Sequence, residues 1–169
     1  MKKSAAATER SVSDMKMIIG VDPGLRGGIT LISGLHANYC YEMPVDEDGI
    51  SACALFDIVE TYGDKELVAY VEHAQAMPKQ GVVSVFNYGV GFGKMLAALE
   101  ISGVKIVLVR PAVWKKALKL PKEKLAAVKM AERLHPIGVF RTERGRLLDG
   151  KAEAFLIAHY GMLKEAGKI

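Results

Sequence analysis

The sequence predicts an α/β domain built on one mixed five-stranded sheet with helices on its faces. Two observations lead to this prediction. Three strand-sized apolar segments follow one another closely in the first part of the chain, which is typical of an antiparallel meander. After them, segments with helical spacing alternate with strand-sized apolar runs, which is typical of strands that run parallel through crossover helices.

The meander accounts for the first three strands. An apolar run at residues 17–21 stops at the turn signal Asp22-Pro23-Gly24 and resumes at residues 28–32, so these two segments predict a β-hairpin. A third strand is expected at residues 38–43, ahead of an acidic loop at residues 46–48.

Helices and strands are expected to alternate in the rest of the chain. Leu55, Ile58 and Val59 recur at helical spacing and predict a crossover helix. Two further strands, both parallel to the first, and three further helices complete the order. The strands are expected at 67–72 and 105–109, and the helices at 90–101, 125–134 and 149–163, with a glycine-rich loop from residue 73, a basic segment at 114–124 and a polar loop at 140–146.

Length and composition limit the class of protein. A chain of 169 residues fits one domain, and a net charge of +4 suits a polyanionic partner without identifying one. Cys40 and Cys53 lie outside any CxxC or histidine-rich setting, so no disulfide scaffold or structural zinc site is predicted. The apolar stretches look strand-sized, well short of the ~20 residues that span a bilayer, so a soluble protein is expected.

Residues 1–16 are expected to form a flexible N-terminal arm ahead of a single domain at residues 17–169. The arm contains charged residues and three consecutive alanines, and it lacks the apolar centre of a secretion signal. An organelle-targeting remnant is the alternative interpretation of this segment.

Acidic residues stand where three apolar elements end or become buried. Asp22 follows the first apolar run. Glu72 follows a later apolar run, at residues 68–71. Asp149 and Glu153 lie four residues apart, on one face of the last helix. Each acid also has an ordinary explanation: Asp-Pro-Gly is a common turn, a strand acid can pair with a basic residue, and aspartate is a good helix cap.

A shared cation site explains all four acids at once. A buried carboxylate requires a partner, and capping does not explain why Glu153 lies on a face of alanines and large apolar residues. Carboxylate oxygens suit Mg²⁺ or Mn²⁺. We expect Asp22, Glu72, Asp149 and Glu153 to be catalytic metal ligands, with two ions per site. Such ions, ~3.5 to 4 Å apart, activate water and stabilise the leaving 3′ oxygen in phosphodiester hydrolysis.

Three motifs in this order resemble the RuvC family of Holliday junction resolvases. They are Ile19-Gly20-Val21-Asp22-Pro23-Gly24, Tyr70-Val71-Glu72 and the segment at 149–158, and the likeness spans residues 17–160. It is greatest to the phage and chloroplast-type branches, which are similar in the stretch at 109–116. The resemblance implies an RNase H-like fold and a Mg²⁺-dependent endodeoxyribonuclease. It also implies that a homodimer resolves four-way DNA junctions by symmetrical paired nicks, in the cytoplasm of a bacterium or phage-infected host, with an organelle as the alternative.

The family's acids map onto Asp22, Glu72, Asp149 and Glu153. Bacterial members typically separate the last two by three residues, and both are aspartates, so which of Asp149 and Glu153 is the direct ligand stays open. The resemblance also implies catalytic lysines near the scissile phosphate, at Lys115, with Lys116 as the alternative, and at Lys124. A lysine there can neutralise phosphate charge in the transition state.

Basic and aromatic residues around these motifs are expected to contact DNA, although a solvated basic face or a core aromatic is the ordinary alternative. The glycines at 89, 91 and 93 are expected to permit close approach of the backbone to phosphate or to a partner subunit. The expected DNA contacts are Lys79, Phe86, Lys94, Arg110, Trp114, Lys115, Lys116, Lys119 and Lys122.

Three other functions stay open. One is another RNase H-like nuclease, which cuts RNA in hybrids or another branched DNA. A second is an actin-type ATPase or phosphotransferase, because Asp-Pro-Gly followed by Gly27-Gly28 resembles a phosphate-binding hairpin, but those folds need roughly twice this length. The third is a junction-binding module without catalytic activity.

Overall fold

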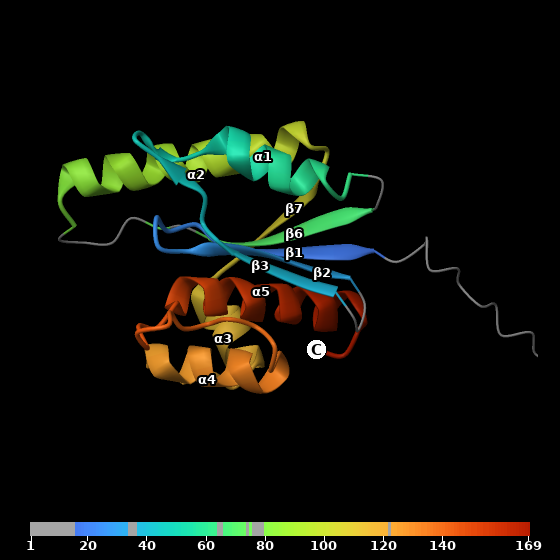
Figure 1. Cartoon of the computed structure of the whole chain (residues 1–169). Helices are drawn as coiled ribbons and strands as arrows, with labels where there is room; N and C mark the ends of the chain where they lie inside the picture. Colours follow the sequence, from blue (N-terminus) through green and yellow to red (C-terminus); the bar gives the residue numbers. More distant parts are fainter. Residues whose placement is uncertain (1–15, 34–36, 64–65, 74, 76–79, 122) are drawn as a thin grey trace, which may run out of the picture.

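The computed structural model describes residues 16–33, 37–63, 66–73, 75, 80–121 and 123–169. The expected N-terminal arm, apart from its last residue, lies outside these ranges. Within them, five strands form one sheet in the order β3-β2-β1-β6-β7, with helices on both faces (Figure 1).

The sheet is mixed, as the sequence predicted. Strand β1 (Met17–Asp22) pairs antiparallel with β2 (Gly28–Ser33), which pairs antiparallel with β3 (Ala37–Glu42). On its other side β1 pairs parallel with β6 (Leu67–Glu72), and β6 pairs parallel with β7 (Lys105–Val109). The meander and the two later parallel strands are therefore confirmed.

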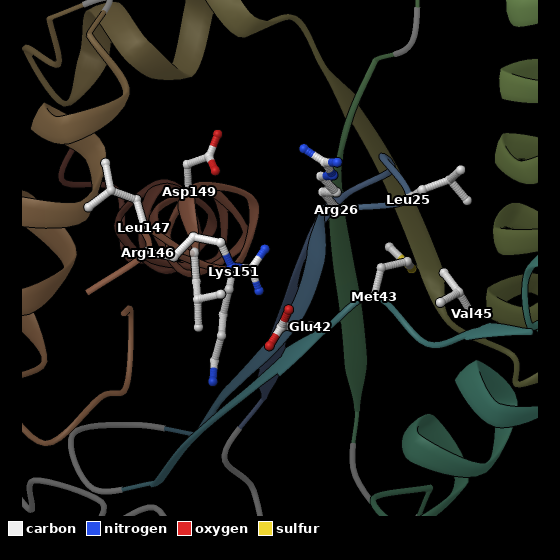
Figure 2. A pocket seen from close by; sticks show the side chains of 10 residues that line it. Leu25, Arg26, Glu42, Met43, Val45, Arg146, Leu147, Asp149 and Lys151 are labelled. Carbon is white, nitrogen blue, oxygen red and sulfur yellow. The ribbon is translucent and has the colours of Figure 1, made fainter. Parts of the chain in front are cut away.

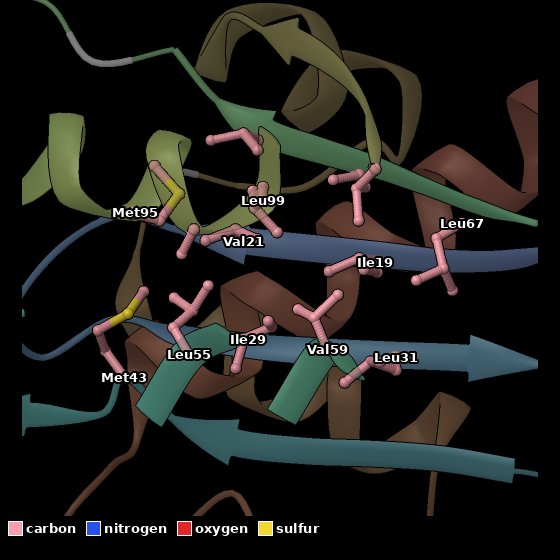
Figure 3. Close-up of a cluster of buried hydrophobic side chains, with 14 of the residues drawn as sticks. Ile19, Val21, Ile29, Leu31, Met43, Leu55, Val59, Leu67, Met95 and Leu99 are labelled. Carbon is pink, nitrogen blue, oxygen red and sulfur yellow. The ribbon is translucent and has the colours of Figure 1, made fainter. Parts of the chain in front are cut away.

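The helices form two layers. Helices α1 (Ala52–Glu60) and α2 (Val82–Ile101) cover one face of the sheet, and α3 (Pro111–Ala117), α4 (Lys124–Leu134) and α5 (Asp149–Glu165) lie on the other (Figure 1). Side chains of a strand alternate between faces, so each central strand contributes to two cores. In β1, Ile19 and Val21 face α1 and α2, whereas Ile18 belongs to the core beneath α5 (Figure 3).

Helix α5 lies unusually close to the sheet because glycines remove the side chains between them. A Cβ atom added to Gly20 of β1 would overlap the backbone of Ala154 and Ala158 in α5. One added to Gly28 of β2 would lie 2.9 Å from the Cα atom of Lys151. The backbone of α5 is therefore held directly against the two strands that flank the Asp22 turn.

Helix α2 begins at Val82, eight residues before the expected start at Val90, so that boundary is wrong. The polar residues and glycines before residue 90 suggested a loop, but each glycine costs a helix only about 1 kcal/mol, and packing outweighs this cost. Gly91 faces Ile50, whose Cδ1 would lie 3.3 Å from an added Cβ. Met95 and Leu99 are fully buried in the same core.

The length of α2 also corrects the expectation that every apolar stretch is strand-sized. Among the described residues, α2 alone has the length and composition of a membrane-spanning helix, with a mean hydropathy of 1.4. A helix that packs against a sheet in a soluble core satisfies the same criterion.

Two smaller elements were not predicted. The acidic loop contains a hairpin of two short strands, β4 (Val45–Asp46) and β5 (Gly49–Ile50), which turns at Gly49 with a φ of 104°. The basic segment after β7 contains the helix α3, which begins at Pro111. Proline is favoured in the first turn of a helix, because its missing N–H has no partner there.

Candidate active site

Two of the predicted acids emerge side by side from the sheet. β1 and β6 are parallel neighbours with Val21 opposite Val71, so the next residues, Asp22 and Glu72, stand together at the carboxyl ends of their strands. Because α5 crosses β1 at the glycine contact described above, it brings Glu153 towards the same edge. Three elements far apart in the sequence thus place carboxylates near one another.

The acids influence one another electrostatically. Burial, together with the negative charges of Glu72 and Glu153, raises the pKa of Asp22 from 3.8 to about 7. The N–H of Gly24 donates a hydrogen bond to Asp22 Oδ1 at 3.3 Å and partly offsets this effect. Burial also raises the pKa of Glu72, and Glu153 adds to that shift. These desolvated, mutually repelling carboxylates favour a bound cation.

Helix α3 supplies partners for two of the acids. The indole Nε1 of Trp114 donates a hydrogen bond to Glu72 Oε2 at 2.9 Å, which lowers the pKa of Glu72 against the effect of burial. Lys115 Nζ lies 2.9 Å from Glu153 Oε1 and 5.0 Å from the centre of the Trp114 ring. Trp114 is fully buried, so its side chain holds Glu72 in one orientation.

Asp149 has a different position from the other three acids. It begins α5, and its Oδ2 lies 2.5 Å from Lys124 Nζ at the start of α4. Asp149 does not contribute to the pKa shift of Asp22, whereas Glu153 does. The structure therefore groups Glu153, rather than Asp149, with the two strand acids, and it places both expected catalytic lysines against acids of α5.

The carboxylates of Asp22, Glu72 and Glu153 are suitable ligands for a hard divalent cation, although two of them contact Trp114 and Lys115 in this structure. Within the described ranges no three His, Cys, Asp or Glu side chains form a ready-made metal site. Lys115 donates a hydrogen bond to an oxygen of Glu153, and Trp114 donates one to an oxygen of Glu72. The acids are nevertheless oxygen donors that gather at one strand end, where burial and then the charges of Glu72 and Glu153 raise the pKa of Asp22.

The expected DNA contacts fall in several places. Arg110, Lys116 and Lys119 are exposed on and around α3, next to the acid cluster. Phe86 is 69% exposed on α2, and Lys94 Nζ donates to the carbonyl oxygen of Asp48 at 3.3 Å on the same helix layer. Lys79 and Lys122 lie outside the described residues.

Trp114 requires a correction. It was expected to contact DNA, but its side chain is completely buried in the core between the sheet and α5. A residue with no exposed surface cannot touch DNA directly. Trp114 instead donates a hydrogen bond to Glu72.

Tyr88 also lies near the acids, although it was not among the expected metal ligands or the expected DNA contacts. Burial raises the pKa of its hydroxyl to about 12, and the charges of Asp22 and Glu72 contribute. The tyrosine on α2 is therefore within electrostatic range of both strand acids. Tyr88 lies in the part of α2 that comes before the expected start of this helix, so its position near the two acids could not be predicted from the sequence.

The fold is RNase H-like and of the RuvC type. The structure is similar to "T. thermophilus RuvC in complex with Holliday junction substrate", with a TM-score of 0.62 and 17% sequence identity. The similarity covers 90% of this chain and 97% of that one. A second structure, of Thermus thermophilus RuvC, gives a TM-score of 0.59 and 18% identity over the same shares of the two chains. No protein-family model and no curated protein sequence matches the chain.

Proposed function

We propose that this protein is a divalent-metal-dependent endonuclease that resolves four-way DNA junctions by symmetrical paired nicks. The observation that carries the proposal is the meeting of Asp22, Glu72 and Glu153 at one strand end, with Lys115 beside them. The RuvC-type fold supports the same class of chemistry. At this level of identity the fold alone does not select the substrate, so the substrate is part of the proposal.

The proposed roles of the residues follow from their positions. Asp22, Glu72 and Glu153 would hold the cations, and Asp149 would join them from the start of α5. When bound, Mg²⁺ ions activate a water molecule and stabilise the leaving 3′ oxygen. Trp114 orients the carboxylate of Glu72 through the 2.9 Å hydrogen bond.

Two lysines lie where they can neutralise phosphate charge. Lys115 and Lys124 each contact an acid of α5, at 2.9 Å and 2.5 Å respectively, so their ammonium groups border the place where a scissile phosphate would lie. Exposed Arg110, Lys116 and Lys119 extend this positive surface around α3, where they can contact backbone phosphates.

Paired nicks in a symmetrical junction require two active sites, so we propose that a homodimer is the working form. Light scattering of the purified protein at the concentration of the cleavage assay tests this part of the proposal. A monomer under conditions where junctions are cut would contradict it.

The decisive experiment is a nicking assay on a synthetic mobile four-way junction, with Mg²⁺ and with chelator. The expected result is symmetrical nicks in two opposing strands with Mg²⁺ and intact strands with chelator. An RNA–DNA hybrid and a plain duplex are assayed in parallel. Cleavage of the hybrid with no cleavage of the junction would replace the resolvase proposal by another RNase H-like nuclease.

A further inference from the structure

A second group of basic residues surrounds a cavity beside Asp149. The cavity has a volume of 310 Å³ and lies between the β1–β2 turn, the end of β3 and the start of α5 (Figure 2). Arg26, Arg146 and Lys151 line it, one from the turn, one from the loop before α5 and one from α5 itself. None of them was among the DNA contacts expected from the sequence.

The charges around the cavity favour an anion. Two acids, Glu42 and Asp149, also line it, but Lys124 already pairs with Asp149 at 2.5 Å. Three cationic side chains therefore line the cavity with only one carboxylate, that of Glu42, that has no basic partner among the described residues. Neither arginine nor Lys151 forms an ion pair with another described residue.

The three cations are attached to well-fixed backbone. Gly27 N–H donates to the Gly24 carbonyl at 2.8 Å and closes the turn that contains Arg26. A Cβ atom at Gly150 would overlap the carbonyl oxygen of Arg26, so this turn is pressed against the first residues of α5.

The loop that carries Arg146 is held by its own hydrogen bonds. Its N–H donates to Thr142 Oγ1 at 3.1 Å, and its carbonyl accepts from Thr142 N–H at 2.9 Å. Gly145 completes this tight turn with a φ of 79°. A rigid support lowers the conformational entropy that the basic group loses when it binds a ligand.

The cavity also has apolar walls. Such walls reduce the local dielectric screening, so a charge at the cavity is attracted more strongly than on an open surface. Arginine adds a planar set of donors that matches phosphate oxygens. The apolar lining comes from Leu25, Met43, Val45, Leu147 and Leu148.

We propose that this cavity binds a backbone phosphate of the nucleic acid strand, next to the phosphate at the acid cluster. The inference rests on the proposed function for the identity of the polymer. Arg26 lies four residues from Asp22 in the same turn, and Asp149 both lines the cavity and lies one helical turn from Glu153. A strand that passes the acids therefore meets the cavity within the same surface.

The test measures binding of the full-length protein to a fluorescent four-way junction, in chelator and over a series of salt concentrations. We compare the wild type with Arg146→Gln, Lys151→Gln and the double variant. Arg144→Gln is the matched control, because Arg144 is exposed in the same loop and does not line the cavity. Each lost phosphate contact should lower the slope of log K against log salt by about 1 and weaken binding roughly tenfold near 0.1 M salt.

The expected result is a reduced slope for both single variants, a larger reduction for the double variant and no change for Arg144→Gln. A wild-type slope in the double variant overturns the proposal. If the double variant unfolds, Arg146→Lys and Arg146→Gln decide between the outcomes: the proposal requires the lysine variant to keep the slope and the glutamine variant to lose it. If the wild-type protein cuts no junction with Mg²⁺ but the variants still show these slope changes, the proposed function is refuted and the proposed phosphate site stands.

Discussion

Replacing Asp22 by Asn should affect stability and activity in opposite directions. In metal-free protein the substitution removes a charge that is buried next to Glu72 and Glu153. A shift in pKa from 3.8 to about 7 corresponds to a loss of about 4 kcal/mol in the free energy of unfolding above pH 7. This value is a ceiling, because Asp22 is only partly buried at its strand end.

The sign of the pH effect follows from the direction of the shift. The pKa of Asp22 is higher in the folded chain than in the unfolded chain, so the folded state prefers the protonated carboxyl. Stability from this group is complete below about pH 4 and is lost as the pH rises to about 7. Asp22→Asn should therefore gain up to about 4 kcal/mol over the wild type at pH 8, about 2 kcal/mol at pH 5 and little at pH 3.5.

Urea unfolding in chelator measures this gain at each pH, and Asp57→Asn, at an exposed position on α1, is the control. With Mg²⁺ the wild type should gain stability by linkage, about 3 kcal/mol at one hundred times the dissociation constant, and the variant should gain less. The same variant should bind junctions and fail to cut them. An Asp22→Asn protein no more stable than wild type in chelator at pH 8 would refute the buried-charge argument.

Three further predictions concern the frame of the site. Gly20→Ala should destabilise the protein by about 3 kcal/mol or more, because the added methyl group meets the backbone of α5. Gly93→Ala, at an open position of α2, should stabilise the protein by up to about 1 kcal/mol. Thermal unfolding of both variants tests this prediction. Trp114→Phe should lose about 2 kcal/mol with the hydrogen bond to Glu72 and should lower kcat, which stopped-flow cleavage measures; an unchanged kcat would remove the orienting role. Lys115→Met should reduce the cleavage rate about 100-fold with little change in junction affinity, and a pure affinity loss would contradict the catalytic role.

The strands were predictable because their signals are local. The pattern around Asp22-Pro23-Gly24 fixes a turn between two apolar runs, and the run that ends at Glu72 is bounded by polar residues on both sides. The same boundaries placed two acids at strand ends. Their proximity followed from the parallel pairing of the two strands, which the order of elements implied.

The helices were less predictable where tertiary packing overrides local preference. The polar residues and glycines before residue 90 suggested a loop, but burial of Met95 and Leu99 and the contact of Gly91 with Ile50 stabilise one continuous helix. The role of Trp114 was also hidden, because a tryptophan among lysines suggests an exposed basic surface. The structure instead buries the indole in the core and brings its N–H within hydrogen-bond distance of Glu72.

Because α5 contacts β1 through main-chain atoms, the distance between Asp22 and Glu153 depends on very few residues. Where α5 meets β1 at Gly20, the separation is set by van der Waals contact between backbone atoms, because no side chain stands between them. Most surrounding core residues can therefore change while the distance from the first strand to Glu153 is retained. A scaffold of this kind tolerates extensive sequence divergence, and its few side-chain-free positions are the ones that a designer of new catalysts on this frame has to keep.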